Sequence, residues 1–537
     1  MKILFLYPNN EGYFRCPIGL TLIMTILKKE GHEIKLFDTT FMAADDNLDS
    51  KLREKNGSAK PIVMDHFFDK HTERELISKW TQTIKEFKPD LIAASILEDA
   101  YEFCSLFIDA VKKDFDIPIA VGGVTPTISP NVIMEHPNID FAIQGEGEVA
   151  FKELVDALEN KTPLSEVGNL WYKDKENDEV VKNKLVKYMD MNKLPNQDID
   201  IWDDKHFLKP YNGKMYRTGF FEMSRGCMHK CHYCFNRYMQ IGLAQSETGK
   251  YRRNKSFDKI IREVLELHKK KNFELLMFTD DNFLARPYRE MEEFYERWSK
   301  EVKIPYWINT CIETINEDNL PLLKKSNCVG IGVGMETGSE WVRRNILKKG
   351  KMTNQMYYDG FKMMADHKIR STCNVMIGFP GEFEGDVFET IKLNKKIRAI
   401  HDELTSCAMS YVAPYAGTVI HNICLDLGLI EVNYQPGFRG LCKEITMRRE
   451  PVIVNPSMSK EKIIELHYSF ADYINGKKDI PKEYLETDLD RKYAIGAEHI
   501  YSLYEQYTGG PVNIDTKKFM KNNLDNFNDY KNQSLLG

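Results

Sequence analysis

The sequence lacks the features that mark membrane, secreted and nucleic-acid-binding proteins. No apolar run approaches the roughly 18 residues of a spanning helix, and the apolar start at residues 2–7 is too short for a secretory signal. Positive charge is not in excess either, because the formal net charge is −6. We therefore expect a cytoplasmic protein with no membrane span and no nucleic acid as a partner.

Paired cysteines are also scarce, which argues against a disulfide framework. Most of the eleven cysteines are scattered inside apolar patterns, as is typical of reduced, buried thiols. These scattered cysteines stand at positions 16, 104, 311, 328, 373, 407, 424 and 442. The remaining three, Cys227, Cys231 and Cys234, lie within eight residues and form the one clear cluster.

This cluster has no fourth cysteine. With three and then two residues between them, the thiols can turn inward onto three corners of one metal or iron–sulfur site. A closed structural zinc site would need a fourth ligand such as His229 or His232, and zinc sites usually combine two cysteine pairs. We favour a [4Fe-4S] cluster over zinc and over three ordinary buried thiols. A cubane held by three thiolates leaves one iron open to a ligand that carries an amine and a carboxylate.

The cysteine spacing, with Tyr233 before the last cysteine, resembles the signature of radical S-adenosylmethionine (SAM) enzymes. In that family the methionine part of SAM occupies the open iron. The resemblance implies that Cys227, Cys231 and Cys234 hold the cluster and that Tyr233 contacts SAM.

The first 158 residues alternate apolar strands and helices, and the chain of 537 residues is long enough for two or three domains. This alternation predicts a doubly wound, Rossmann-like parallel sheet, in which a ligand binds at the carboxyl ends of the strands. Glycine and serine stand at those ends, where a large ligand needs close approach to the backbone.

The motifs at these strand ends resemble the cobalamin-binding domain that precedes many radical SAM enzymes. The resemblance implies cobalamin contacts at Tyr7, Pro8, Gly19, Leu20, Ser95, Gly122, Gly123, Thr125, Gly145, Glu146 and Gly147. The cobalamin mutases carry an Asp-x-His-x-x-Gly motif that is absent here, since Asp65-His66 lacks the spacing. We therefore expect no histidine ligand on the lower face of cobalt.

From residue 216 the alternation restarts with a different period. Strands are expected at 219–224, 274–280, 305–312, 329–336, 370–379 and 405–413, with helices between them. This pattern predicts a partial (β/α)6 barrel over 216–425, with reacting groups at the carboxyl ends of its strands. Residues 159–215 are expected to be a linker with a hairpin near 168–182. Residues 426–537 are expected to form a helical C-terminal domain, with helices near 460–475 and 490–507.

Motifs at the ends of the barrel strands extend the resemblance to the cobalamin-dependent, class B methyltransferase-like branch of the family. They imply SAM contacts at Thr279, Asp280, Asp281, Glu336, Ser339, Ile377, Gly378 and Tyr411. Taken singly, each aspartate fits a turn before a helix equally well, and Glu336 is next to a possible helix N-cap at Thr337 or Ser339. The related methylthiolases carry three cysteines in an N-terminal domain, whereas this chain has only Cys16 and Cys104 before the cluster.

The resemblance implies methylation of an unactivated carbon or phosphorus centre through methylcobalamin and a 5′-deoxyadenosyl radical. A small-molecule or peptide substrate and an external low-potential reductant of the flavodoxin or ferredoxin type are expected partners. One alternative keeps all three cofactors but performs ring contraction, cyclisation or rearrangement without methyl transfer. A cobalamin and iron–sulfur sensor of redox state or light is a further alternative, although a sensor would not need every barrel-end motif.

Overall fold

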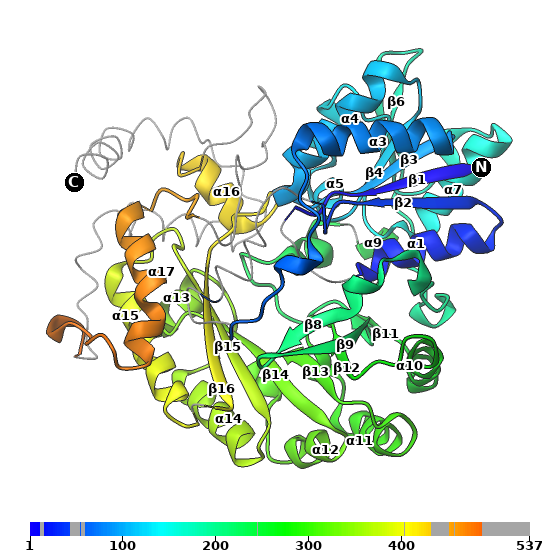
Figure 1. The fold of residues 1–537 in the computed structure, drawn as a ribbon. Coiled ribbons are helices and arrows are strands. Elements are labelled where there is room, and N and C mark those ends of the chain that lie inside the picture. Colours follow the sequence, from blue (N-terminus) through cyan, green and yellow to red (C-terminus); the bar gives the residue numbers. More distant parts are fainter. Residues whose placement is uncertain are drawn as a thin grey trace.

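The computed structural model describes residues 1–10, 16–42, 54, 60–243, 245–401, 403–430, 450–455 and 457–485. Two sheets dominate this part of the chain and lie in separate halves of the molecule (Figure 1). The expected helix near 490–507 and Cys442 lie outside the described residues. No helix in the described ranges is long and apolar enough to cross a membrane.

The first sheet has the strand order β2-β1-β3-β4-β5-β6-β7. Its first five strands are parallel, and the hairpin of β6 and β7 continues the sheet in antiparallel fashion. The strands are β1 (Lys2–Tyr7), β2 (Glu33–Asp38), β3 (Leu91–Ser95), β4 (Ile119–Gly122), β5 (Phe141–Ile143), β6 (Leu170–Asp174) and β7 (Glu179–Lys182).

Helices cover both faces of this sheet because the buried residues of its strands alternate. Ile3 and Phe5 of β1 pack in one cluster with α1 (Ile18–Lys29) and α7 (Gly147–Asn160), whereas Leu4 and Leu6 pack in another with α3 (Glu73–Phe87) and α4 (Tyr101–Asp114). Two short helices, α5 (Val124–Ile128) and α6 (Pro130–Glu135), follow β4. The predicted doubly wound sheet is confirmed.

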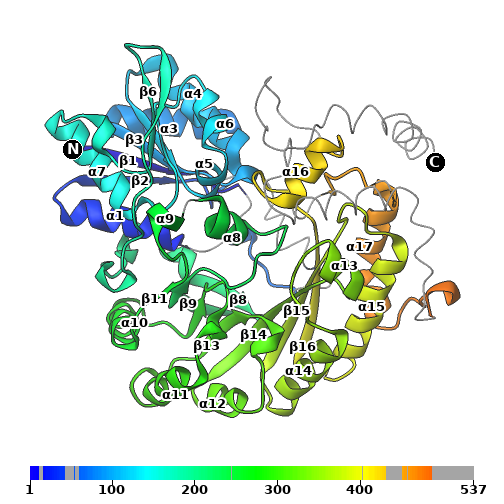
Figure 2. The same ribbon diagram turned by 180° about the vertical axis from the view of Figure 1, so that it is seen from behind.

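The second sheet has the order β16-β15-β14-β13-β12-β9-β8, and all but the edge strand β8 run parallel. It is an open, curled sheet with helices along its outer side, which confirms the partial barrel (Figures 1 and 2). The strands are β8 (Leu208–Tyr211), β9 (Lys214–Phe221), β12 (Leu275–Phe278), β13 (Tyr306–Thr310), β14 (Cys328–Glu336), β15 (Arg370–Ile377) and β16 (Thr405–Tyr411).

The helices of the second half follow the strands in turn. They are α10 (Phe257–Lys271), α11 (Tyr288–Arg297), α12 (Asn319–Lys325), α13 (Glu340–Asn345), α14 (Asn354–Asp366), α15 (Glu384–Arg398), α16 (Val419–Asp426) and α17 (Lys460–Ile474). Ser256 shows why α10 begins where it does, because its hydroxyl accepts a hydrogen bond from Lys259 N at 3.2 Å. The expected helix near 460–475 corresponds to α17, which packs on α15 and β16.

The region between residues 159 and 215 contributes to both sheets. β6 and β7 extend the first sheet, and β8 with the start of β9 forms the edge of the second. After β9 come the small elements β10 (Ser224–Arg225), α8 (Phe235–Arg237), α9 (Gln245–Thr248) and β11 (Arg253–Asn254). Figure 2 shows α8 between the two sheets, so the chain around the cysteine cluster lies where the two halves meet.

Short 3-10 and π turns complete the described elements. The 3-10 turns are η1 (Asp65–Phe67), η2 (Glu98–Ala100), η3 (Leu164–Glu166), η4 (Met191–Lys193), η5 (Ile199–Ile201), η6 (Asp204–Phe207), η8 (Phe283–Ala285), η10 (Ile312–Thr314) and η11 (Lys482–Tyr484). The π turns are η7 (Tyr238–Gly242) and η9 (Trp298–Val302).

Candidate functional site

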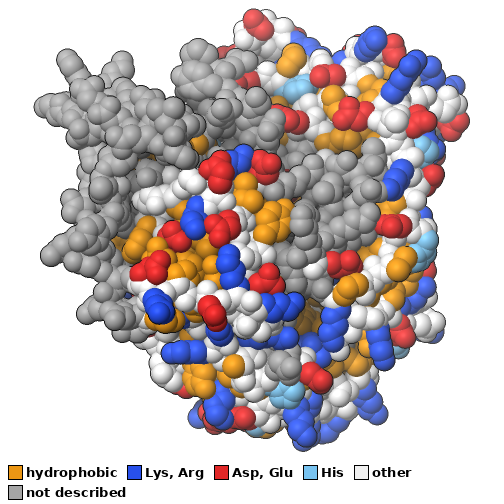
Figure 3. All heavy atoms as spheres, turned by 60° about the vertical axis from the view of Figure 1, so that its left-hand side comes forward, with side chains coloured by type: hydrophobic (Ala, Val, Ile, Leu, Met, Phe, Trp, Pro, Cys, Tyr) orange, Lys and Arg blue, Asp and Glu red, His pale blue; other side chains and the backbone are white. Residues whose placement is uncertain are grey.

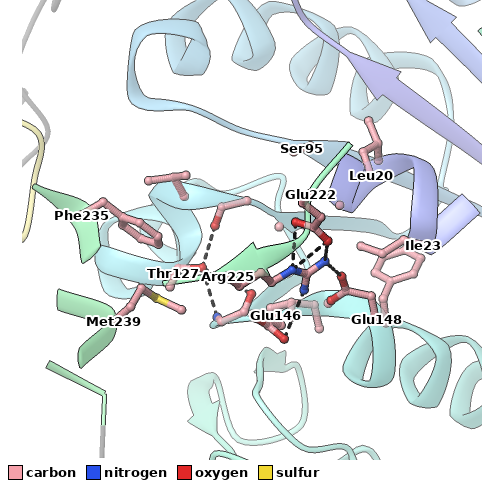
Figure 4. Close-up of a pocket in the computed structure, with 18 of the residues that line it drawn as sticks. Leu20, Ile23, Ser95, Thr127, Glu146, Glu148, Glu222, Arg225, Phe235 and Met239 are labelled. Carbon is pink, nitrogen blue, oxygen red and sulfur yellow. Dashed lines mark hydrogen bonds and ion pairs between the residues drawn. The ribbon is translucent and has the colours of Figure 1, made fainter. Parts of the chain in front are cut away.

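A cavity of about 390 Å³ lies between the two halves of the molecule. One wall consists of loops at the carboxyl ends of the first sheet, and the other comes from the chain just before and after the cysteine cluster (Figure 4). Residues from the first wall include Ser95, Gly122, Gly123, Thr127 and Gly145. Residues from the second include Glu222, Arg225, Phe235, Met239, Tyr251, Thr279 and Asp281. Ligands of parallel sheets bind at the carboxyl ends of the strands, and here the strand ends of both halves border the same cavity.

Eight of the eleven residues expected at the cobalamin site line this cavity. They are Gly19, Leu20, Ser95, Gly122, Gly123, Gly145, Glu146 and Gly147. Tyr7, Pro8 and Thr125 do not line it. Tyr7 instead packs edge-on against Trp202, with the ring centroids 5.3 Å apart, and Thr125 is fully buried with a hydroxyl that has no hydrogen-bond partner.

Sequence reasoning missed the bridge that joins the two glycine loops of this wall. Thr127 Oγ1 donates to the Gly123 carbonyl at 2.7 Å and accepts from Gly145 N at 3.1 Å. Its neighbour Gly122 borders open space, since a Cβ atom there would meet no atom within 4 Å. The wall is thus held rigid while leaving room for a large ligand.

The cysteine loop is fixed by the two acidic residues that follow β12. Asp280 accepts hydrogen bonds from Met223 N at 3.0 Å and from Ser224 Oγ at 2.5 Å, and Asp281 accepts one from Gly226 N at 3.1 Å. Burial raises the pKa of Asp280 to about 6. In this structure both carboxylates, which we expected to contact SAM, orient the entry to the cysteine cluster.

The three thiols of the cluster differ in their surroundings. Burial raises the pKa of Cys231 to about 11 and that of Cys234 to about 12. The pKa of Cys227 is instead lowered to about 6, because its sulfur accepts a hydrogen bond from the Cys311 thiol and another from His229 N at 3.5 Å. All three thiols belong to one loop, and each can become a thiolate ligand. Cys227, with the lowest pKa, loses its proton most readily.

Cys311 had been counted among the scattered thiols, but it lies beside the cluster loop. Its sulfur and the ligand atoms of His229 and Glu313 are all within 4.8 Å of one another. His229 Nε2 is hydrogen-bonded to Glu313, and this contact raises the pKa of His229. No sequence spacing signals this proximity, because Cys311 and Glu313 follow β13 while His229 follows β10.

An ion-pair network joins the two walls of the cavity. The guanidinium of Arg225 contacts Glu148 at 2.7 Å, Glu222 at 2.8 Å and Glu146 at 3.3 Å (Figure 4). Arg253, which is opposite Arg225 in the β10–β11 pair, also binds Glu146. Two carboxylates of the first half are thus bound by two arginines of the second half, one in β10 just before the cysteine cluster and the other in β11, the strand that pairs with β10.

A second buried network surrounds Glu336 at the end of β14. Its carboxylate accepts from Lys349 Nζ at 2.6 Å and from the Tyr233 hydroxyl at 2.9 Å. The backbone of Glu336 has a φ of 71°, which is uncommon for a residue other than glycine. Tyr233 and Glu336, both expected at the SAM site, are therefore in direct contact, whereas Lys349 was not foreseen.

The other residues expected at the SAM site are distributed along the strand ends. Thr279 lines the cavity, and Ser339 caps α13 by accepting from Val342 N at 3.3 Å. Ile377 is buried at the end of β15, and Gly378 N donates to Glu382 at 2.7 Å. Tyr411 is buried, its hydroxyl has no hydrogen-bond partner, and its ring stacks on His467 with centroids 4.1 Å apart.

The cysteine triad follows the first parallel strand of an open β/α barrel and faces a doubly wound sheet. This arrangement defines a two-domain cofactor enzyme. Residues 221–393 match the family model of the radical SAM superfamily, and residues 66–155 match that of the B12 binding domain. The chain is therefore a cobalamin-dependent radical SAM enzyme. Its cofactors are SAM, a [4Fe-4S] cluster and cobalamin, as expected.

Curated relatives span most of the chain at low identity. An uncharacterised methyltransferase of Pyrococcus horikoshii is 26% identical over 434 residues, which are 78% of this chain and 82% of the relative. The anaerobic magnesium-protoporphyrin IX monomethyl ester cyclase of Synechocystis is 22% identical over 78% of this chain and 74% of its own. Cytidylyl-2-hydroxyethylphosphonate methyltransferase of Streptomyces wedmorensis is 23% identical over 65% of this chain and 67% of its own.

Two solved structures share the fold over nearly the whole chain. The radical SAM methyltransferase TsrM from Kitasatospora setae, with cobalamin and a [4Fe-4S] cluster, has a TM-score of 0.58 and 14% identity, and the match covers 94% of this chain and 99% of TsrM. The cobalamin-dependent radical enzyme OxsB, with aqua-cobalamin and SAM, has a TM-score of 0.60 and 14% identity, and the match covers 98% of this chain and 75% of OxsB.

The residues present fit these cofactors. Gly122 leaves open space on the wall of the cavity where cobalamin is expected. On the other side Cys227, Cys231 and Cys234 form no disulfide and remain available as ligands.

Proposed function

We propose that this enzyme methylates an unactivated carbon or phosphorus centre of a small molecule or peptide. The observation that carries the proposal is the shared cavity, whose walls come from the cobalamin motifs and from the chain around the cysteine cluster. Cobalamin carries a methyl group and the cluster with SAM supplies a 5′-deoxyadenosyl radical when they are bound. Methyl transfer needs both reactive centres to face one substrate, which a single cavity allows.

The residues of this chain would bind, orient and shield the reactants. Cys227, Cys231 and Cys234 hold the cluster, and Asp280 and Asp281 fix the loop that carries them. Tyr233 and Glu336 offer a hydroxyl and a carboxylate to the polar groups of SAM, with Lys349 balancing the charge. The apolar side chains of Leu20, Ile23, Phe235 and Met239 exclude water from the cavity.

A second candidate is ring formation with the same cofactors and no methyl transfer. It is favoured by the relatives that are named as magnesium-protoporphyrin IX monomethyl ester cyclases. The fold and the three cofactors are the same for both candidates, so the products of SAM distinguish them.

The experiment follows the methyl group. The reconstituted enzyme is incubated without oxygen with titanium citrate, hydroxocobalamin, SAM that carries a deuterated methyl group, and the small-molecule extract of its host. Methylation predicts 5′-deoxyadenosine, S-adenosylhomocysteine and a deuterated product that all require the enzyme. Consumption of an extract compound with 5′-deoxyadenosine but without S-adenosylhomocysteine would instead support ring formation. The Cys227→Ala variant is the matched control and should yield no 5′-deoxyadenosine.

A further inference from the structure

We propose that an acidic electron-transfer protein docks on a positively charged face of this enzyme, made by Lys230, Arg237, Lys348 and Lys351. This inference rests on the proposed placement of the cluster at Cys227, Cys231 and Cys234, and it adds the surface through which the cluster is reduced. The whole chain carries a net charge of −6, so a local group of cations without acidic partners stands out.

The four cations belong to the cysteine loop or to the segments that contact it. Lys230 lies in the loop between two of the cysteines, and Arg237 follows it at the end of α8, where its guanidinium donates to the Lys230 carbonyl at 3.3 Å. Lys348 and Lys351 belong to the segment after α13, which packs against the loop. His232 N donates to the Leu347 carbonyl at 3.0 Å, and a Cβ atom on Gly350 would lie 3.9 Å from the His229 ring.

These charges are available to a partner. Lys230 and Lys351 are exposed, Arg237 and Lys348 are half-buried, and in the described part of the chain none of the four takes part in an ion pair within 4.0 Å. Two acidic side chains that contact residues of the cysteine loop or of the segment after α13 are already paired, because Glu313 binds His229 and Glu336 binds Lys349. Elsewhere on the surface, as in Figure 3, charges of both signs are interspersed.

The same loop carries an exposed apolar residue, Met228, which directly follows Cys227 and is 44% exposed. An exposed methionine with cations around it suits a transient contact with a protein of opposite charge, since complementary charges speed encounter and the small apolar contact allows release. The redox step is a single electron transfer. The reduced flavin or iron–sulfur centre of the partner loses one electron, and the cluster gains it before SAM is cleaved.

The test measures how fast the cluster is reduced, and it needs no substrate. The Lys230→Glu/Lys351→Glu variant and the natural chain, each with a reconstituted cluster, are mixed without oxygen with flavodoxin hydroquinone, and the loss of the cluster's visible absorption is followed. At low ionic strength the second-order rate constant should fall about tenfold in the variant, and the difference should shrink as salt screens the charges. The matched control Lys113→Glu/Lys269→Glu changes the same charge at exposed positions on α4 and α10 and should retain the natural rate.

Reduced methyl viologen, a small cation, separates docking from damage to the cluster. It should reduce the variant at least as fast as the natural chain, because the charge reversal no longer repels it. An unchanged rate with flavodoxin, or an equal loss of rate in the control variant, would overturn the docking site. Absence of iron and of visible absorption from the natural chain would instead contradict the placement of the cluster itself.

Discussion

Arg225 and Glu148 form a buried ion pair that connects the two halves of this enzyme. The guanidinium lies 2.7 Å from the carboxylate, and both side chains are nearly buried, with 13% and 4% of their surfaces exposed. Arg225 stands two residues before Cys227, whereas Glu148 lies in the first turn of α7, directly after the residues Gly145–Gly147 that we expected to bind cobalamin. This ion pair therefore links the segment that enters the cysteine cluster to the glycine loop of the first half.

Replacing Arg225 should destabilise the enzyme strongly. The variant Arg225→Met leaves three carboxylates close together, those of Glu146, Glu148 and Glu222, without their shared cation. Loss of one partner in a buried ion pair costs about 3–5 kcal/mol of unfolding free energy. The midpoint of urea unfolding measures this cost.

Arg217→Met is the matched control for that experiment. Arg217 pairs with Asp204, but the two side chains are 30% and 52% exposed, so the expected cost is below about 1 kcal/mol. Equal losses of unfolding free energy in the two variants would show that the buried Arg225 network stabilises the enzyme no more than an exposed ion pair does.

Cys227→Ala should remove the cluster and leave cobalamin binding intact. The iron-bound loop and the glycine loops belong to different halves, so the cobalamin wall does not need the cluster in order to form. Iron content and visible absorption should be lost, while hydroxocobalamin should still elute with the protein in gel filtration. Cys424→Ala, which changes a buried thiol of α16, should keep its iron. Loss of both cofactors from the Cys227 variant would mean that the halves depend on each other for folding.

Gly122→Leu should weaken cobalamin binding and leave the cluster intact. A Cβ atom at this position would meet no atom within 4 Å, so a leucine side chain would extend into the cavity that Gly122 lines, and the backbone of Gly122 has no positive φ that would strain it. We expect a loss of cobalamin affinity of about tenfold or more, since filling the site removes contacts worth at least about 1.4 kcal/mol. Iron content should be unchanged, and Gly122→Ala should be intermediate. Undiminished hydroxocobalamin binding by the leucine variant in a spectroscopic titration would place the corrin elsewhere.

The sequence motifs were enough to predict both sheets and part of the cavity wall, chiefly the glycine loops of the first sheet. Glycines at the ends of β4 and β5 and the cysteine triad are local patterns, and each is visible within about ten residues. The partners of Arg225 could not be predicted in this way. Glu148 is 77 residues away from it in the sequence, and only the packing of the two halves brings the charges together.

Lys349 and Cys311 were missed for a related reason. Each lies in a loop between regular elements, and nothing in the sequence indicates that those loops fold toward the cysteine cluster. Asp280 has a second role that its position in the sequence did not reveal. Its place at a strand end predicted a contact with SAM, and the structure adds that the carboxylate accepts a hydrogen bond from the backbone of the cysteine loop, where Met223 N would otherwise be buried without an acceptor.

Glu336→Gln should weaken SAM binding. The amide keeps the shape of the side chain but removes the charge that is paired with Lys349, and we expect about a tenfold rise in the dissociation constant of SAM. Because the single variant leaves Lys349 unpaired, the double variant Glu336→Gln/Lys349→Met is measured beside it. Equilibrium dialysis of both variants and of the exposed control Glu317→Gln gives the comparison. Natural affinity in the double variant would exclude Glu336 from the SAM site.

Glu382→Gln should change how stability depends on pH. Glu382 is fully buried, and this burial raises its pKa to about 8, although Gly378 N and Phe379 N donate to the carboxylate. The side chain in an unfolded chain has a pKa of about 4.3. Between these values the folded state holds a proton that the unfolded state has released, so stability falls as the pH rises through this window and levels off above it.

The glutamine variant has no such proton, and its amide oxygen can still accept from Gly378 N. Its unfolding free energy should therefore rise relative to that of the natural chain by up to about 1.4 kcal/mol for each pH unit between about pH 5 and pH 8. Urea unfolding of both proteins across this range measures the difference. Parallel curves would mean that Glu382 is ionised in the folded enzyme at neutral pH, and that the turn after β15 holds a buried charge rather than a neutral acid.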